Sequence, residues 1–140
     1  MSLSIRNQIP GTVTAVTAGE VMATVKVRLD GGQDLTAAIT LEAVEDLGLA
    51  EGSAVRALVK STEVALATGP VAGVSIRNQL PGTVREVATG GAMATVRVAV
   101  DGGQDVTAAI TRDAVADLGL AAGAEVVALI KSTEVSLATT

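Results

Sequence analysis

The sequence predicts a mainly β protein built of two tandem five-stranded barrels, each with one short helix. Two patterns predict this fold class: an internal repeat that spans almost the whole chain, and a period of two in the apolar residues of each copy. The decapeptide at residues 4–13 (SIRNQIPGTV) returns at residues 75–84 (SIRNQLPGTV), and the similarity continues to the C-terminus without a gap. The offset of about 71 residues is far longer than a solenoid unit, so each copy is a small domain. We expect one domain at residues 1–69, a linker at 70–74 and a second domain at 75–140.

The first strand of each copy begins within the repeated decapeptide. Gly11 and Gly82 interrupt this strand early. Glycine inside a strand often marks a bulge or a tight bend, so we expect an irregularity at these positions.

The second and third strands form a hairpin. Apolar and polar residues alternate along residues 21–29, which puts the apolar set on one face of a strand. Residues 30–32 (DGG) tolerate the positive φ angles of a tight turn, and the alternation resumes at Leu35, Ala37 and Ile39. The run 30–34 (DGGQD) lacks the spaced ligands and the terminal Glu of a calcium loop, so a hairpin turn is favoured over a cation site.

One short helix follows the third strand. From Leu41 the apolar spacing changes, with Val44 and Leu47 three residues apart. Thr40 stands where a helix N-cap belongs, and Gly48 can adopt the left-handed conformation that ends a helix. Thr111 and Gly119 repeat the arrangement. The sequence therefore predicts a helix at about residues 41–47 and another at the equivalent place in the second copy.

Two more strands complete each copy, at residues 55–59 and 64–67. Five strands with a helix between the third and the fourth is the element order of an oligonucleotide/oligosaccharide-binding barrel. Residues 68–74 (TGPVAGV) link the copies. This link is short and partly apolar, so we expect the two domains to pack against each other.

The composition limits how much each domain can stabilise itself. Of the 140 residues 49% are hydrophobic, but none is Phe, Tyr, Trp or Cys, so the core consists of aliphatic side chains without a disulfide. A domain of this size buries only about 60% of its unfolded surface. Oligomerisation is therefore the expected source of additional buried area.

The composition also excludes several functions. Without His or Cys the chain cannot form a His- or thiolate-ligated metal site, a Cys nucleophile or a Ser-His-Asp triad, so we expect no enzyme and no metal site. A net charge of -5 and the absence of aromatic residues disfavour nucleic acid as a partner. No apolar run approaches the length of a membrane span and no signal peptide is visible, so we expect a cytoplasmic protein without membrane association.

Few polar residues recur in both copies without a strand-face or capping role. Ser4, Arg6 and Asn7 stand at the start of the first strand, and Lys60 and Ser61 follow the fourth. They recur as Ser75, Arg77, Asn78, Lys131 and Ser132. Arginine, lysine and hydroxyl groups are charge-assisted donors that suit an oxyanion. The alternative reading is that these residues are solvated strand ends and turn formers.

The segments that carry these residues resemble the molbindin family, the small molybdate- and tungstate-binding proteins built from Mop domains, and most of all its two-domain (di-Mop) form. The resemblance covers residues 4–13, Thr40, residues 46–49 (DLGL) and 60–64 (KSTEV), and again residues 75–138. It implies a barrel of the oligonucleotide-binding type, molybdate or tungstate as the bound ligand without an organic cofactor, and cytoplasmic storage or buffering of that oxyanion. It also implies particles of six Mop domains, so a chain that carries two of them should form a homotrimer.

The resemblance further implies oxyanion sites between Mop domains, formed by the Ser-x-Arg-Asn segment, the Lys-Ser pair and the Thr before the helix. Carried over residue by residue, the site comprises Ser4, Ile5, Arg6, Asn7, Thr40, Lys60 and Ser61 in the first copy and Ser75, Ile76, Arg77, Asn78, Thr111, Lys131 and Ser132 in the second. The family often has Ala where this chain has Ile5 and Ile76, so only the backbone N–H could serve there. It commonly has Asn where this chain has Met22 and Met93, which disfavours a second class of site near a threefold axis.

Three functions stay open from the sequence. The first is storage or buffering of the oxyanion. The second is a sensor whose anion-dependent surface is read by a protein partner. The third is a purely structural oligomerisation module. The choice between molybdate and tungstate is also open, because the two ions are nearly equal in size.

Overall fold

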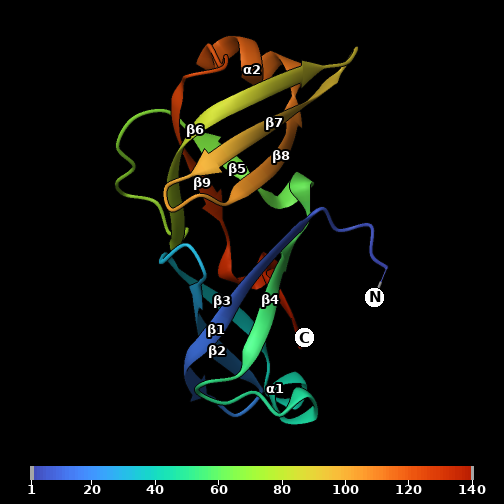
Figure 1. Cartoon of the computed structure of the whole chain (residues 1–140), viewed down its shortest axis with the longest axis vertical. Coiled ribbons are helices and arrows are strands. Elements are labelled where there is room, and N and C mark those ends of the chain that lie inside the picture. Colours follow the sequence, from blue (N-terminus) through green and yellow to red (C-terminus); the bar gives the residue numbers. More distant parts are fainter. Residues whose placement is uncertain (1, 140) are drawn as a thin grey trace.

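The computed structural model describes residues 2–139, which fold into two similar lobes stacked along the long axis of the molecule (Figure 1). The two α-helices lie at opposite outer ends, and the short 3₁₀ helices lie near the middle. The elements are β1 (Asn7–Ala18), β2 (Met22–Leu29), β3 (Asp34–Thr40), α1 (Leu41–Leu47), β4 (Ala54–Val59), η1 (Ser61–Glu63), β5 (Ala65–Ala67), β6 (Asn78–Thr89), β7 (Met93–Val100), β8 (Asp105–Thr111), α2 (Arg112–Leu118), β9 (Glu125–Ile130), η2 (Ser132–Glu134) and β10 (Ser136–Thr139).

Each lobe is a curled five-stranded antiparallel sheet, which confirms the mainly β fold class. The strand order is β10-β4-β1-β2-β3 in the first lobe and β5-β9-β6-β7-β8 in the second. The order leaves β10 and β3 at the edges of the first sheet and β5 and β8 at the edges of the second, so each sheet is a partly open barrel. No helix among residues 2–139 is long and apolar enough to cross a membrane.

The fifth strand of each lobe comes from the other repeat. Strand β5 of the first repeat pairs with β9, with Ala65 opposite Leu129, and β10 of the second repeat pairs with β4, with Ser136 opposite Leu58. The two exchanged strands follow nearly identical segments and use equivalent registers, so the sequence pattern does not reveal which lobe each one joins. The exchange is the intramolecular counterpart of domain swapping, and it ties the lobes together through two ladders.

The core contains only aliphatic side chains, as the composition requires. The alternation along β2 is complete, with every second residue buried, and Val25 and Val27 have no exposed surface. The equivalent Val96 and Val98 of β7 are also fully buried. The period of two in the sequence therefore marks the inner face of both sheets correctly.

The irregularity in the first strand lies in a different place from the one predicted. Strand β1 continues in register through Gly11 and shifts between Val13 and Ala15 instead. A Cβ atom on Gly11 would lie 2.7 Å from the carbonyl oxygen of Arg28 and 2.7 Å from Cγ1 of Val27. Gly11 is thus required for the close approach of β1 to β2, and the prediction of a bulge at this residue was wrong.

The helix ends match the prediction. The Oγ1 of Thr40 accepts a hydrogen bond from the backbone N–H of Ala43 at 3.1 Å, and Gly48 ends the helix with φ at 62°. Thr111 accepts in the same way from Ala114 at 3.1 Å. Each helix covers one outer end of its lobe (Figure 1).

The turns between β2 and β3 and between β7 and β8 meet where the lobes face each other. A Cβ atom on Gly31 would lie 3.0 Å from the carbonyl oxygen of Gly102. The lobes therefore pack directly against each other, as the short linker predicts.

Candidate functional site

A hollow of about 270 Å³ gathers most of the predicted oxyanion residues of the first repeat. It is lined by Ser4, Ile5, Arg6, Lys60, Ser61 and Thr62. The antiparallel ladder explains why residues so far apart in sequence meet. Asn7 at the start of β1 pairs with Val59 at the end of β4, so the residues just before β1 and just after β4 emerge at the same edge of the sheet.

The second repeat places its residues in the same way. Asn78 pairs with Ile130, so residues 75–77 and 131–132 emerge together. Of these residues, however, only Ile76 and Lys131 line a hollow, which has a volume of about 290 Å³; Ser75, Arg77 and Ser132 are not part of its lining. Its other walls are β8 and the segment of the first repeat around η1, including Glu63. This second hollow lies between the lobes because the exchanged strand β5 brings η1 against β8.

The guanidinium groups of Arg6 and Arg77 organise their own loops. Nε of Arg6 donates to the carbonyl oxygen of Ser4 at 3.1 Å, and Nη2 donates to that of Leu3 at 2.7 Å. Arg77 makes the equivalent bonds to Ser75 and Val74, both at 3.2 Å. The two side chains remain largely exposed. Each arginine therefore fixes the conformation of its own loop, and Arg6 also lines the first hollow, whereas Arg77 does not line the second.

The lysine and serine that follow the fourth strand supply the other donors. Lys60 and Lys131 are exposed, and neither forms an ion pair within the described residues. The Oγ of Ser61 is buried and has no hydrogen-bond partner among residues 2–139. The hollow of the first repeat thus combines two cationic side chains with a hydroxyl group that has no hydrogen-bond partner among the described residues.

Asn7 and Asn78 are differently placed from the other predicted residues. Both side chains are 4% exposed. Nδ2 of Asn7 donates to the carbonyl oxygen of Thr107, and its Oδ1 accepts from the N–H of Thr107, both at 2.8 Å. Asn78 makes the same pair of 2.8 Å bonds with Thr36. The two amides therefore satisfy the edge strands of the opposite lobes, β8 and β3, and are not free to bind an anion.

Thr40 and Thr111 lie at the other end of the lobes from the rest of their predicted sites. Thr40 pairs with Met22, and β1 and β2 meet at Ala18 and Ala23, so these residues share the outer end of the first sheet. The residues before β1 share the inner end with Val59. One chain therefore brings together Ser4, Ile5, Arg6, Lys60 and Ser61 but leaves Thr40 in a separate hollow of about 390 Å³.

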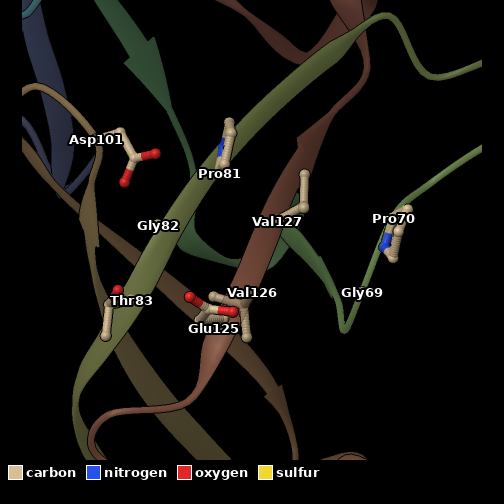
Figure 2. A pocket seen from close by; sticks show the side chains of 9 residues that line it. All are labelled: Gly69, Pro70, Pro81, Gly82, Thr83, Asp101, Glu125, Val126 and Val127. Carbon is tan, nitrogen blue, oxygen red and sulfur yellow. The ribbon is translucent and has the colours of Figure 1, made fainter.

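A further hollow of about 360 Å³ lies between the linker and strands β6 and β9 (Figure 2). Its lining includes Pro70 and Pro81, and its charged side chains are Asp101 and Glu125. No lysine or arginine of the described residues lines it, so this hollow offers an anion no charge-assisted donor. Outside the basic hollows, the hydrogen bond from Arg28 lowers the pKa of the exposed Asp34 carboxyl group.

Sequence reasoning missed two features of the site. Thr62 lines both basic hollows, and Glu63 lines the one that contains Lys131 of the other repeat. Both residues recur, as Thr133 and Glu134, and that recurrence is the signal that could have identified Thr62. The contribution of Glu63 to the other repeat's hollow depends on the strand exchange.

Comparison with known proteins finds the same domain family in both repeats. The chain matches the TOBE domain family over residues 3–66 and again over residues 74–137. A crystal structure of the cytoplasmic molybdate-binding protein ModG, with molybdate bound, superposes with a TM-score of 0.97 and 42% identity over 100% of both chains.

Curated relatives extend beyond this chain. The molybdenum-pterin-binding protein MopB of Rhodobacter capsulatus is 44% identical over 136 residues, which is 96% of this chain and 50% of that protein. The molybdenum transport protein ModE of Azotobacter vinelandii is 41% identical over 138 residues, 99% of this chain and 51% of that protein. The chain thus spans about half the length of these relatives.

Proposed function

Because the chain belongs to the TOBE-domain family and has the two-domain (di-Mop) organisation of the molbindins, we propose that it binds molybdate or tungstate and holds the oxyanion in reserve in the cytoplasm. The single observation that carries the proposal is the basic hollow, in which Arg6, Lys60 and the unpartnered hydroxyl of Ser61 meet at one sheet edge. The similarity to ModG along the whole chain supports molybdate as the ligand.

The chemistry of the hollow fits a tetrahedral dianion. One arginine and one lysine balance the two negative charges, and hydroxyl groups and backbone N–H groups complete the set of donors. The protein in this proposal supplies only hydrogen bonds and charge. A cavity held by a rigid sheet would discriminate against sulfate, because a smaller ion would leave some donors unpaired.

We propose that a neighbouring copy of the chain completes each site. Thr40 lies at the outer end of its lobe, far along the sheet from Arg6, so Thr40 can reach an oxyanion in a basic hollow only from another molecule. The same holds for Thr111 and Arg77. Three chains would carry six lobes, as in the particles of the molbindin family.

We expect the chain to form a trimer that does not dissociate to a folded monomer at micromolar concentration. The physical reason is that an aliphatic core of this size leaves each lobe marginally stable, so the interfaces add necessary buried area. Exposed Val21, Met22 and Met93, at 72%, 45% and 48%, offer apolar surface for such interfaces. Sedimentation equilibrium measures the mass, and a stable monomer would contradict the proposed assembly.

Replacing Lys131 by Ala should weaken molybdate binding about ten- to a hundredfold at the sites that use it, because a charge-assisted hydrogen bond contributes about 1.5 to 3 kcal/mol. Arg6→Ala should weaken binding by a similar factor and also loosen residues 3–6, because the guanidinium bonds that hold this loop are lost. Titration calorimetry measures both effects. Lys26→Ala, on an exposed face of β2, is the matched control, and wild-type affinity in Lys131→Ala would contradict the assigned role.

A second candidate function is an oxyanion-responsive module read by a protein partner. The observation that favours it is the match to ModE of Azotobacter vinelandii, in which a segment similar to this whole chain makes up about half of a longer protein. Native mass spectrometry of the protein purified from cells grown with molybdate tests storage, because it reports the number of chains and of bound oxyanions together. Many ions per particle support storage, whereas an ion-dependent complex with another protein supports the sensor.

A further inference from the structure

The outer ends of the two lobes, where Thr40 and Thr111 lie, have the same backbone conformation. The first end comprises the turn at residues 19–22 with residues 40–47, and the second comprises residues 90–93 with 111–118. The φ and ψ angles are -72° and 148° at Thr40 and -72° and 150° at Thr111. In both, Oγ1 accepts one hydrogen bond from the helix, so its own O–H remains free to donate. The ends can therefore be compared residue by residue.

The first end is strongly acidic. Glu20, Glu42 and Glu45 line the same hollow as Thr40, and all three are exposed. Asp46 adds a fourth carboxylate, and no lysine or arginine occurs in this end. An anion that approaches Thr40 therefore meets a negative field.

The second end has lost most of this charge. Gly91 and Ala116 stand where the first end has Glu20 and Glu45. Arg112 replaces Leu41, and its Nη1 donates to the carbonyl oxygen of Gly90 at 3.4 Å, so its guanidinium lies over the turn beside Thr111. The carboxylates that remain are Asp113 and Asp117. The net charges of the two ends thus differ by three units, although their backbone conformations are the same.

We infer that the protein has two classes of oxyanion site in equal number, and that the sites completed by Thr111 bind the dianion more tightly than the sites completed by Thr40. This inference rests on the proposed function. A dianion and a carboxylate several ångströms apart in water repel by about 1 kcal/mol, and salt screens this repulsion. Because three such charges act together at low ionic strength, the two classes should differ in affinity about a hundredfold, and the difference should shrink as salt is added.

The repeats themselves supply the test variant and its control. Glu20→Gly with Glu45→Ala introduces into the first end the residues that the second end has at these positions, Gly91 and Ala116. Because the two ends share one backbone conformation, both substitutions should be accommodated without strain. Glu125→Ala with Val127→Arg changes the net charge by the same amount, again with residues that the other repeat carries, but on β9 beside the linker hollow (Figure 2). Titration calorimetry with sodium molybdate, on the assembled full-length protein at low ionic strength, measures both.

The expected result is two classes of sites in the wild-type protein, with the weak class strengthened about tenfold or more in Glu20→Gly/Glu45→Ala and unchanged in the control pair. One class of uniform affinity that neither pair of substitutions alters would overturn the inference and leave the proposed function standing. Equal strengthening by both pairs would also overturn it, since bulk charge would then explain the effect. No heat of binding in any of the proteins would refute the proposed function itself.

Discussion

Asn7→Ala is expected to lower the free energy of unfolding by about 2 to 4 kcal/mol. The substitution removes both hydrogen bonds between the Asn7 amide and Thr107, and it leaves an N–H and a carbonyl group of the edge strand β8 without partners. Each such group costs about 1 to 3 kcal/mol when it is shielded from water. A folded domain is stable by only about 5 to 15 kcal/mol, so Asn7→Ala with Asn78→Ala should approach the limit of folding.

Urea denaturation at a fixed protein concentration measures this effect. Gln79→Ala is the matched control, because Gln79 is exposed beside Asn78 and makes one local bond to Ile76. Asn7→Asp tests the direction of the bonds: a carboxylate still accepts from the N–H of Thr107 but faces its carbonyl oxygen without a proton to donate. Stability equal to the wild type in Asn7→Ala would show that the amide does not hold the edge strand.

The elements whose identity depends on local pattern could be predicted from the sequence. The alternation along residues 21–29 reports the buried face of β2, because side chains of a strand point alternately inward and outward. Thr40 and Gly48 define the ends of α1 through their own capping hydrogen bonds and backbone angles. These signals are confined to a few consecutive residues, and they hold in both repeats.

Features that depend on distant partners could not be predicted in this way. The strands β5 and β10 have similar sequences and equivalent registers, so only the folded chain decides which lobe each one joins. A buried Asn at a strand start has the same appearance in sequence whether it faces a ligand or another backbone, and Asn7 faces Thr107. Thr40 and Arg6 belong to one repeat, yet the antiparallel ladder puts them at opposite ends of one sheet.

The strand exchange and the hydrogen bonds of Asn7 and Asn78 both join the two lobes near the basic hollows. Each basic hollow is built where the two lobes meet, since η1 packs beside β8 and residues 4–6 directly precede Asn7. A ligand that neutralises charge at this place stabilises the contact between lobes as well as its own site. Ligand binding and unfolding of the assembly should therefore be strongly linked.

Molybdate or tungstate should raise the melting temperature of the protein by roughly 10 °C at a concentration of about a hundred times Kd. A ligand bound only by the native state adds about 2.7 kcal/mol per site under these conditions, and 1 kcal/mol shifts Tm by about 2 to 4 °C in a chain of this size. Relief of repulsion adds to the effect, because Arg6 and Lys60 share one hollow and leave unbalanced positive charge when no anion is bound. Sulfate, which leaves donors unpaired in a cavity fitted to a larger ion, should shift Tm much less.

The measurement is a set of thermal scans with molybdate, sulfate and chloride at matched ionic strength. Lys60→Ala with Lys131→Ala should remove most of the molybdate shift, because the first hollow then keeps only Arg6 as a cation and the second loses the lysine that lines it. Lys26→Ala with Arg97→Ala changes the net charge equally on the exposed faces of β2 and β7 and should preserve the shift. Equal shifts with all three anions would mean that the stabilisation is general screening of the chain's cations, and a specific oxyanion site at Arg6 and Lys60 would then have to be abandoned.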